Sequence, residues 1–169
     1  QITSNLKGSL FSKLMINSCI TTLGAITGIT LGELLKISTA RALFLKVFTE
    51  AVMVAKAEGI KLEKVAGKID PYSFALTGDE MNKNFSMSLL KKHLILLAVG
   101  MKYRKLKSSS LQSLQRGKST EVDHLNGYIV EKAKKHNLPT PVNERLLQIV
   151  KEIESGKRQI ELENLYRVI

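Results

Sequence analysis

The chain has 169 residues, a formal net charge of +11 and an apolar residue content of 44%. This length favours one domain with a sizeable core, and this composition excludes a disordered chain. The longest apolar run without glycine, residues 94–99, is too short to span a membrane. The first residues lack the apolar core of a signal peptide, so we expect a cytoplasmic protein that does not bind a membrane.

The basic residues are spread along the chain rather than gathered in one segment. They occur together at residues 91–92, 102–107, 132–135 and 157–158. Several of these groups fall near expected helix C-termini, where cations interact favourably with the helix dipole. A basic helical nucleic-acid binder is one alternative, but scattered charge fits a basic face that meets an anionic cofactor or substrate better.

The residues that usually hold metals or form disulfides are few. Cys19 is the only cysteine and lies in an apolar segment, so we expect a buried free thiol. None of His93, His124 and His136 has a second ligand one helical turn away, so we expect no metal site. The sequence also contains no glycine motif for binding a dinucleotide or a triphosphate.

Apolar residues recur with helical spacing through most of the chain. Ser9 is expected to open a first, strongly apolar helix, and Gly24 and Gly28 are expected to loosen its end. Ser38 is expected to cap a second helix that ends at Gly59.

Turns and a third helix follow. Residues 70–71 and 77–79 have the composition of turns. The segment 87–101 then carries apolar residues at helical spacing, which predicts a third long helix with one apolar face. Residues 108–117 are small and polar and leave room for one short helical turn.

Two further helices are predicted from their end signals. Thr120 and Asp123 form an acidic variant of the capping box, and residues 136–137 close the helix that they open. Residues 140–141, a threonine followed by a proline, predict the next helix start, and Gly156 ends that helix.

A short amphipathic segment over residues 160–166 completes the chain. No stretch alternates with period two over more than a few residues, and no linker is long enough to divide the chain. We therefore predict an all-α fold of about six or seven helices, in one domain that covers residues 1–169.

A polar stripe interrupts the first apolar helix. Lys13, Asn17 and Thr21 follow one another at intervals of four, so they lie along one face of the helix. The simple interpretation is the solvated edge of a half-buried helix. The functional interpretation is a stripe that faces a cleft, where a lysine can deliver a proton.

Two other groups have a similar pair of interpretations. Glu121 lies in the first turn after Thr120, where it can complement the helix dipole or present a carboxylate at the rim of a cleft. The three serines at residues 108–110 are either flexible loop residues or donors to a substrate carboxylate.

Together these segments carry a resemblance to a known family. The segments are Lys13-Leu14-Met15-Ile16-Asn17, Ser109-Ser110-Leu111-Gln112-Ser113, Thr120-Glu121-Val122-Asp123 with Asn126-Gly127, and Pro139-Thr140-Pro141-Val142-Asn143. In this order they resemble the C-terminal helical domain of ketopantoate reductase (2-dehydropantoate 2-reductase). The resemblance implies the all-α domain that these enzymes share with 6-phosphogluconate dehydrogenase-like proteins.

The resemblance also implies functions for single residues. Lys13 would donate a proton to the ketone oxygen of ketopantoate, while NADPH supplies hydride to the carbon. Glu121 would hold this lysine and the substrate hydroxyl, and Asn17 and Ser109 would orient the keto acid. Thr21 stands where a further asparagine is often found, and would still bind substrate with a shorter reach.

Other departures from the family concern residues 110 and 113. Ser110 replaces the usual methionine, and Ser113 replaces the usual aspartate. These changes affect the expected identity of the keto acid more than the reaction class. A reductase of another branched 2-keto acid is therefore one alternative.

The family carries an N-terminal Rossmann domain that makes most of the contacts to NADPH. This sequence lacks the dinucleotide-binding glycine motif of such a domain. We therefore expect the isolated chain to fold without catalysing the step to pantoate in pantothenate and coenzyme A biosynthesis. The second alternative is a non-catalytic helical oligomerisation or binding module of the same fold. A domain without its partner exposes apolar surface, so we also expect a homodimer, formed through the first helix.

Overall fold

The computed structural model describes residues 4–65, 67–82 and 86–168, and these residues form helices without a β-strand. The elements, in chain order, are α1 (Leu6–Thr27), α2 (Leu31–Leu34), α3 (Ser38–Ala57), α4 (Pro71–Phe74), α5 (Gly78–Met81), α6 (Met87–Lys102), α7 (Ser109–Gln115), the π-helical turn η1 (Asp123–Gly127), α8 (Tyr128–Lys135), α9 (Pro141–Glu154) and the 3-10 helix η2 (Leu162–Arg167). Six of the described α-helices have seven residues or more. The predicted all-α fold is therefore confirmed.

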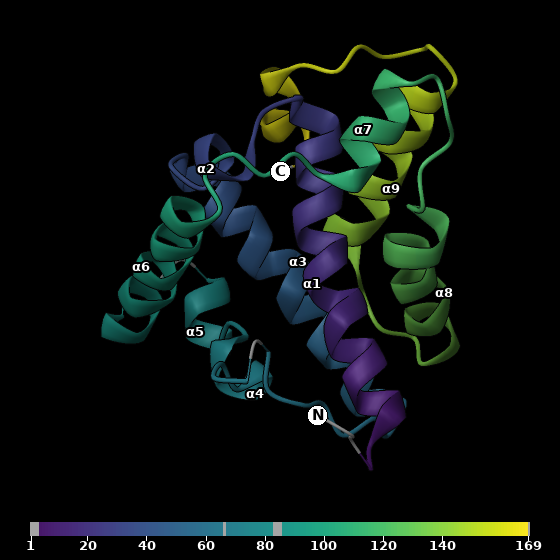
Figure 1. The fold of residues 1–169 in the computed structure, drawn as a ribbon. Coiled ribbons are helices and arrows are strands. Elements are labelled where there is room, and N and C mark those ends of the chain that lie inside the picture. The colour runs from purple at the N-terminus through teal and green to yellow at the C-terminus, as the bar shows by residue number, and fades with distance from the viewer. Residues whose placement is uncertain (1–3, 66, 83–85, 169) are drawn as a thin grey trace.

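The helix α1 runs through the centre of the molecule (Figure 1). It packs against α3, α7, α9, η1 and η2, while α6 lies apart from it and packs against α2. Met15, Cys19 and Leu23 of α1 are completely buried. By length and composition α1 could cross a membrane, but 67% of its most apolar window is buried in this fold. It is the central core helix, and burial raises the pKa of the Cys19 thiol.

The ends of α1 differ from the prediction. Asn5, not Ser9, caps the helix, because its Oδ1 atom accepts a hydrogen bond from the backbone N–H of Gly8 at 3.1 Å. Gly24 does not end the helix; a Cβ atom there would lie 2.8 Å from the Ser108 hydroxyl oxygen. This glycine therefore lets α7 approach α1 closely. Gly28 ends α1 with a positive φ of 75°.

Two other predicted helix caps are wrong. Ser38 is the first residue of α3, and the N-cap is Ile37, which makes no side-chain capping bond. Thr120 precedes a π-helical turn rather than an α-helix, and its hydroxyl donates to Glu154 Oε1 at 2.8 Å. The Asp123 carboxylate pairs with Lys151 instead of closing a capping box.

The apolar face that the sequence predicts for α6 points outward. Met87, Leu94 and Met101 are 63%, 54% and 70% exposed. The buried side of α6 carries Lys92 and Leu96. Apolar periodicity identified this helix correctly but could not tell which of its two apolar sides faces the core.

A buried ion pair anchors α6 to the α5 segment. The Lys92 Nζ atom donates to Glu80 Oε2 at 2.5 Å and to the carbonyl oxygen of Ala75 at 2.7 Å. Burial alone would raise the pKa of Glu80, but hydrogen bonds from Lys92, the Thr77 backbone and Ser86 outweigh it and lower this pKa to about 2.

A buried polar network joins four elements on the other side of α1. The Glu50 carboxylate, from α3, accepts hydrogen bonds from the backbone N–H groups of Val142 and Asn143, both at 2.9 Å. It thereby caps α9, whose N-cap Thr140 makes no side-chain capping bond. Burial raises the pKa of Glu50, although hydrogen bonds from Asn143 and Val142 oppose this shift.

The network continues from α9 to α1. The Asn143 amide donates to Glu50 at 2.6 Å, and its carbonyl oxygen accepts from the Asn126 amide at 2.9 Å. The Thr22 hydroxyl of α1 donates to the Asn126 carbonyl oxygen at 2.5 Å. No described buried side-chain polar atom lacks a partner. The turn η1 is therefore fixed against α1 by side-chain hydrogen bonds as well as by packing.

We predict that Asn143→Ala lowers the free energy of unfolding by about 3 kcal/mol, because it removes a side-chain donor to the buried Glu50 carboxylate and the side-chain acceptor of the buried Asn126 amide. Urea unfolding measures this change. The control is Asn137→Gly, at an exposed residue with φ of 52°, which should change stability by less than about 0.5 kcal/mol. Equal effects of the two substitutions would show that the network does not stabilise the fold.

We predict that Lys92→Met costs about 3 kcal/mol at pH 7, because it leaves the Glu80 carboxylate buried and unpaired. A depressed carboxyl pKa contributes stability above the unfolded value near 4.5 and loses it as the pH falls towards about 2. The difference between wild type and variant should shrink over that window. Lys91→Met, at the exposed neighbouring residue, is the control; a difference independent of pH would contradict this account.

Candidate functional site

The predicted site residues Lys13 and Asn17 line one pocket. They lie on successive turns of α1 and face a cavity of about 340 Å³, whose other wall is the segment 63–65. Ser12 holds this wall, because its hydroxyl donates to the Glu63 carbonyl oxygen at 3.0 Å and accepts from the Glu63 N–H at 3.1 Å. The exposed side chain of Lys13 and the half-buried one of Asn17 therefore face a pocket that has a fixed wall.

Thr21 lies on the same face of α1 but outside this pocket. Its hydroxyl donates to the carbonyl oxygen of Asn17 at 2.7 Å, and the residue is only 8% exposed. The backbone of its own helix thus already uses this hydroxyl. A threonine that donates to the carbonyl four residues earlier is common in helices. The predicted substrate-binding residue Thr21 therefore does not line the pocket of Lys13 and Asn17.

The serines at residues 108–110 form the ordered start of a helix rather than a flexible loop. Ser108 caps α7 by accepting from the Leu111 N–H at 3.1 Å, and Ser109 is the exposed first residue of this helix. Ser108 packs against Gly24, which continues the face of Lys13 and Asn17 two turns further along α1. Ser109 therefore stands near the far end of the polar stripe.

Glu121 is exposed and lies between α7 and η1. Val122, which is 1% exposed, anchors this segment in the core, and Asn126 binds it to Thr22 of α1. Among the described residues, neither Lys13 nor Glu121 has an ion-pair partner. The two residues are thus held on α1 and on a segment packed against α1, but they are not paired with each other.

Sequence reasoning missed Glu50 and the amide functions of Asn126 and Asn143. The one available signal was a carboxylate, Glu50, within the otherwise apolar run of α3. Asn126 and Asn143 stood inside the family motifs, yet they are completely buried. They position the candidate site and do not line it.

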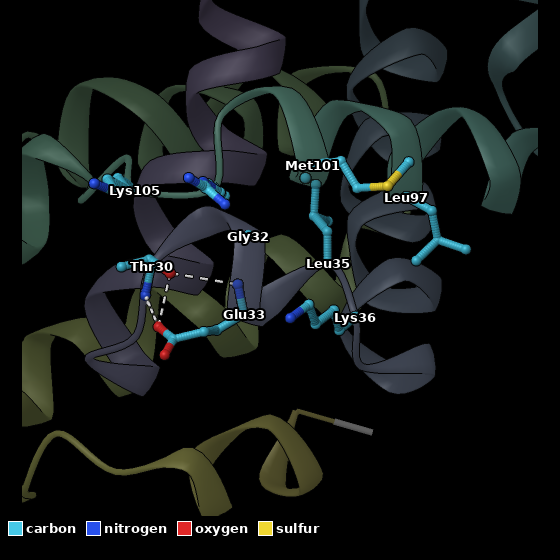
Figure 2. A pocket seen from close by; sticks show the side chains of 10 residues that line it. Thr30, Gly32, Glu33, Leu35, Lys36, Leu97, Met101 and Lys105 are labelled. Atoms are coloured by element: carbon cyan, nitrogen blue, oxygen red, sulfur yellow. Dashed lines mark hydrogen bonds between the residues drawn. The ribbon is translucent and has the colours of Figure 1, made fainter.

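A larger pocket lies elsewhere, between α2 and the end of α6 (Figure 2). Its volume is about 820 Å³, and its lining contains none of the predicted site residues. The capping box of α2 forms one edge, where the Thr30 hydroxyl and N–H both bond to Glu33. Lys36 and Lys105 add positive charge around an apolar floor. Glu33 is the one acidic residue of this lining, and the capping box of α2 already engages its carboxylate.

Comparison with known proteins identifies relatives. Residues 5–154 match the family described as ketopantoate reductase PanE/ApbA C terminal. The chain is 29% identical over 156 residues to 2-dehydropantoate 2-reductase of Pyrococcus horikoshii, covering 92% of this chain and 43% of that protein. It is 48% identical over 50 residues to the enzyme of the same name from Archaeoglobus fulgidus, covering 30% of this chain and 17% of that protein.

Solved structures give the same result. A PanE/ApbA family ketopantoate reductase from Ralstonia eutropha JMP134 has a TM-score of 0.70 and 29% identity, over 93% of this chain and 44% of that one. D-mandelate dehydrogenase, solved with NADH and anilino(oxo)acetate, shares the fold with a TM-score of 0.70 at 22% identity, over 92% of this chain and 43% of that one. The chain spans less than half the length of these relatives, and it belongs to the ketopantoate reductase C-terminal domain family.

Proposed function

We propose that this chain is the substrate-binding and catalytic domain of an NADPH-dependent 2-dehydropantoate 2-reductase, which reduces ketopantoate to pantoate in pantothenate and coenzyme A biosynthesis. One observation carries the proposal: Lys13 and Asn17 face one pocket, while Ser109 and Glu121 belong to segments packed on the same helix. Membership of the family supports the reaction class.

In this proposal the Lys13 ammonium donates its proton to the ketone oxygen as negative charge develops there. The Asn17 amide and the Ser109 hydroxyl hydrogen-bond the keto acid and fix its orientation. Glu121 accepts a hydrogen bond from the substrate hydroxyl and draws the Lys13 ammonium towards the substrate, and Thr21 continues the polar face between Asn17 and Ser109. When bound, NADPH supplies the hydride to the carbonyl carbon, so that ketone, hydride and proton give the alcohol.

The cofactor is assigned to a nucleotide-binding domain outside this chain. The sequence contains no dinucleotide-binding glycine motif, and we assign no residue of α1–α9 to NADPH. D-mandelate dehydrogenase, similar in fold, was solved with NADH, which supports a nicotinamide cofactor for the complete enzyme. A cytoplasmic location stays a prediction.

A fusion tests the proposal. The chain alone should not oxidise NADPH in the presence of ketopantoate, whereas the chain placed after the nucleotide-binding domain of a related reductase should do so. Lys13→Ala in the fusion should lower kcat at least 100-fold, the usual size of a general-acid effect. The assay is the loss of NADPH absorbance. Lys7→Ala, an exposed lysine of the same helix outside the pocket, is the control and should leave kcat unchanged.

A non-catalytic module that assembles through its apolar surface is the second candidate. The exposed apolar stripe of α6 favours it, and a ketopantoate reductase from Staphylococcus aureus of similar fold is dimeric. By exposed apolar side chains, α6 is a better candidate for a homodimer contact than the predicted α1. The exposed large apolar side chains of α1 are Leu6 and Leu10, in its first turns. An inactive fusion that still self-associates would support this module and overturn the reductase proposal.

A further inference from the structure

A basic segment links α6 to α7 and has no part in the proposed reaction. Arg104, Lys105 and Lys107 follow the last turn of α6, and all three side chains are exposed. Within the part of the chain that the structure describes, none of these three residues belongs to an ion pair. Three cations without acidic partners, gathered in four residues, are available to bind an anion.

Close backbone contacts fix this segment on α2. A Cβ atom at Gly32 would lie 2.5 Å from the Cα atom of Arg104, so the lack of a side chain at Gly32 lets the two backbones approach this closely. The backbone N–H of Leu31 donates to the carbonyl oxygen of Leu106 at 2.9 Å. The backbone that carries the cations is therefore held in one place before any ligand binds.

Two hollows of different character meet at Lys105. The first is the pocket of about 820 Å³ between α2 and α6, where Leu97 and Met101 add apolar surface (Figure 2). The second is a groove of about 570 Å³, and its lining is mostly basic and amide residues: Lys105, Leu106, Lys107, Gln112, Gln115 and Arg116. The pocket therefore suits an apolar group, and the groove suits a chain of negative charges.

The charge around these hollows is mainly positive. Lys36 and Arg104 join Lys105 around the pocket, against the single acid Glu33. The Thr30 hydroxyl and N–H already hold the Glu33 carboxylate, at 2.7 and 2.9 Å. The described lining of the groove has no acidic residue. A single carboxylate would leave most of these cations unpaired, whereas a di- or triphosphate brings several charges and suits the planar guanidinium of arginine.

We propose that the pocket and the groove form one binding site for a nucleoside di- or triphosphate. The nucleoside lies on Leu97 and Met101, where the thioether can contact an aromatic base. The phosphate chain crosses Arg104 and Lys105 and continues to Lys107 in the groove. A volume of about 820 Å³ is in the range of small-molecule sites. Neither lining contains a residue of the proposed reaction, so this site goes beyond that function and does not depend on it.

Isothermal titration calorimetry of the 169-residue chain with ATP, tripolyphosphate and adenosine tests the site. ATP should bind at least about tenfold more tightly than tripolyphosphate, because only ATP also buries apolar surface in the pocket. Adenosine should bind most weakly of the three, because it carries no negative charge. Tripolyphosphate that binds as tightly as ATP would reduce the site to a general attraction of anions and overturn the proposal.

Two double variants that lose the same charge test where the cations must stand. Arg104→Gln with Lys105→Gln should weaken the binding of ATP at least about tenfold, through the loss of two charge-assisted hydrogen bonds. Lys91→Gln with Lys134→Gln removes equal charge at exposed residues outside both linings, and should change the dissociation constant less than about twofold because salt screens distant charges. Equal losses in the two variants would show a response to net charge alone and would contradict the site.

A matched pair of leucines on α6 tests the apolar part. Leu97→Ser should weaken the binding of ATP about fivefold and leave tripolyphosphate unaffected, because it removes apolar surface from the pocket only. Leu94→Ser, at an exposed residue outside the lining, should leave both ligands unaffected. If Leu97→Ser does not separate ATP from tripolyphosphate, no nucleoside lies in the pocket and the proposal falls.

Two further probes exclude other sources of the same chemistry. NADPH, added at the concentration of ATP, should displace little of it, because its diphosphate carries a second nucleoside for which the basic groove has no apolar floor. Single-stranded DNA of about ten nucleotides should bind no more tightly than ATP. Full displacement by NADPH would assign the pocket to the cofactor, and tighter binding of DNA would assign the basic segment to nucleic acid; either result overturns the proposal.

Discussion

The Glu50 carboxylate holds the start of α9 from inside α3, and the rest of the structure around the candidate site depends on this contact. A buried carboxylate is costly unless it is hydrogen-bonded, and Glu50 meets this requirement with two backbone N–H groups and the Asn143 amide. Asn143 then binds Asn126, which binds Thr22 of α1. The network specifies how α1, α3, η1 and α9 fit together, because hydrogen bonds are directional in a way that apolar contacts are not.

The consequence for function is that α1 serves as a common support. It carries Lys13 and Asn17, approaches α7 closely at Gly24, and binds η1 through Thr22. Segments about one hundred residues apart in sequence are thereby placed on one helix. The same helix lines a polar pocket with Lys13 and Asn17, and Ile16 between them also borders an apolar cavity.

Local signals in the sequence predicted much of this fold. Apolar periodicity identified the long helices, and residues 140–141 and Gly156 marked the ends of α9 correctly. The errors arose where long-range contacts override local preference. Gly24 lies inside α1, where the absence of a side chain leaves room for Ser108. Asp123 pairs with Lys151 instead of capping a helix, and the apolar stripe of α6 faces outward. Motif spacing predicted Lys13 and Asn17 as site residues, and the fold places them in one pocket; only the fold showed that Asn126 and Asn143 are buried and hydrogen-bonded to each other.

The most direct test of the account is a double-mutant cycle on ketopantoate binding in the fused protein, with Lys13→Ala and Glu121→Gln alone and together. The account holds that the network places both side chains against one ligand. It therefore predicts that the two losses of binding free energy are not additive, with a coupling of at least about 1 kcal/mol. Strictly additive losses, or a Glu121→Gln variant that binds like the wild type, would contradict it.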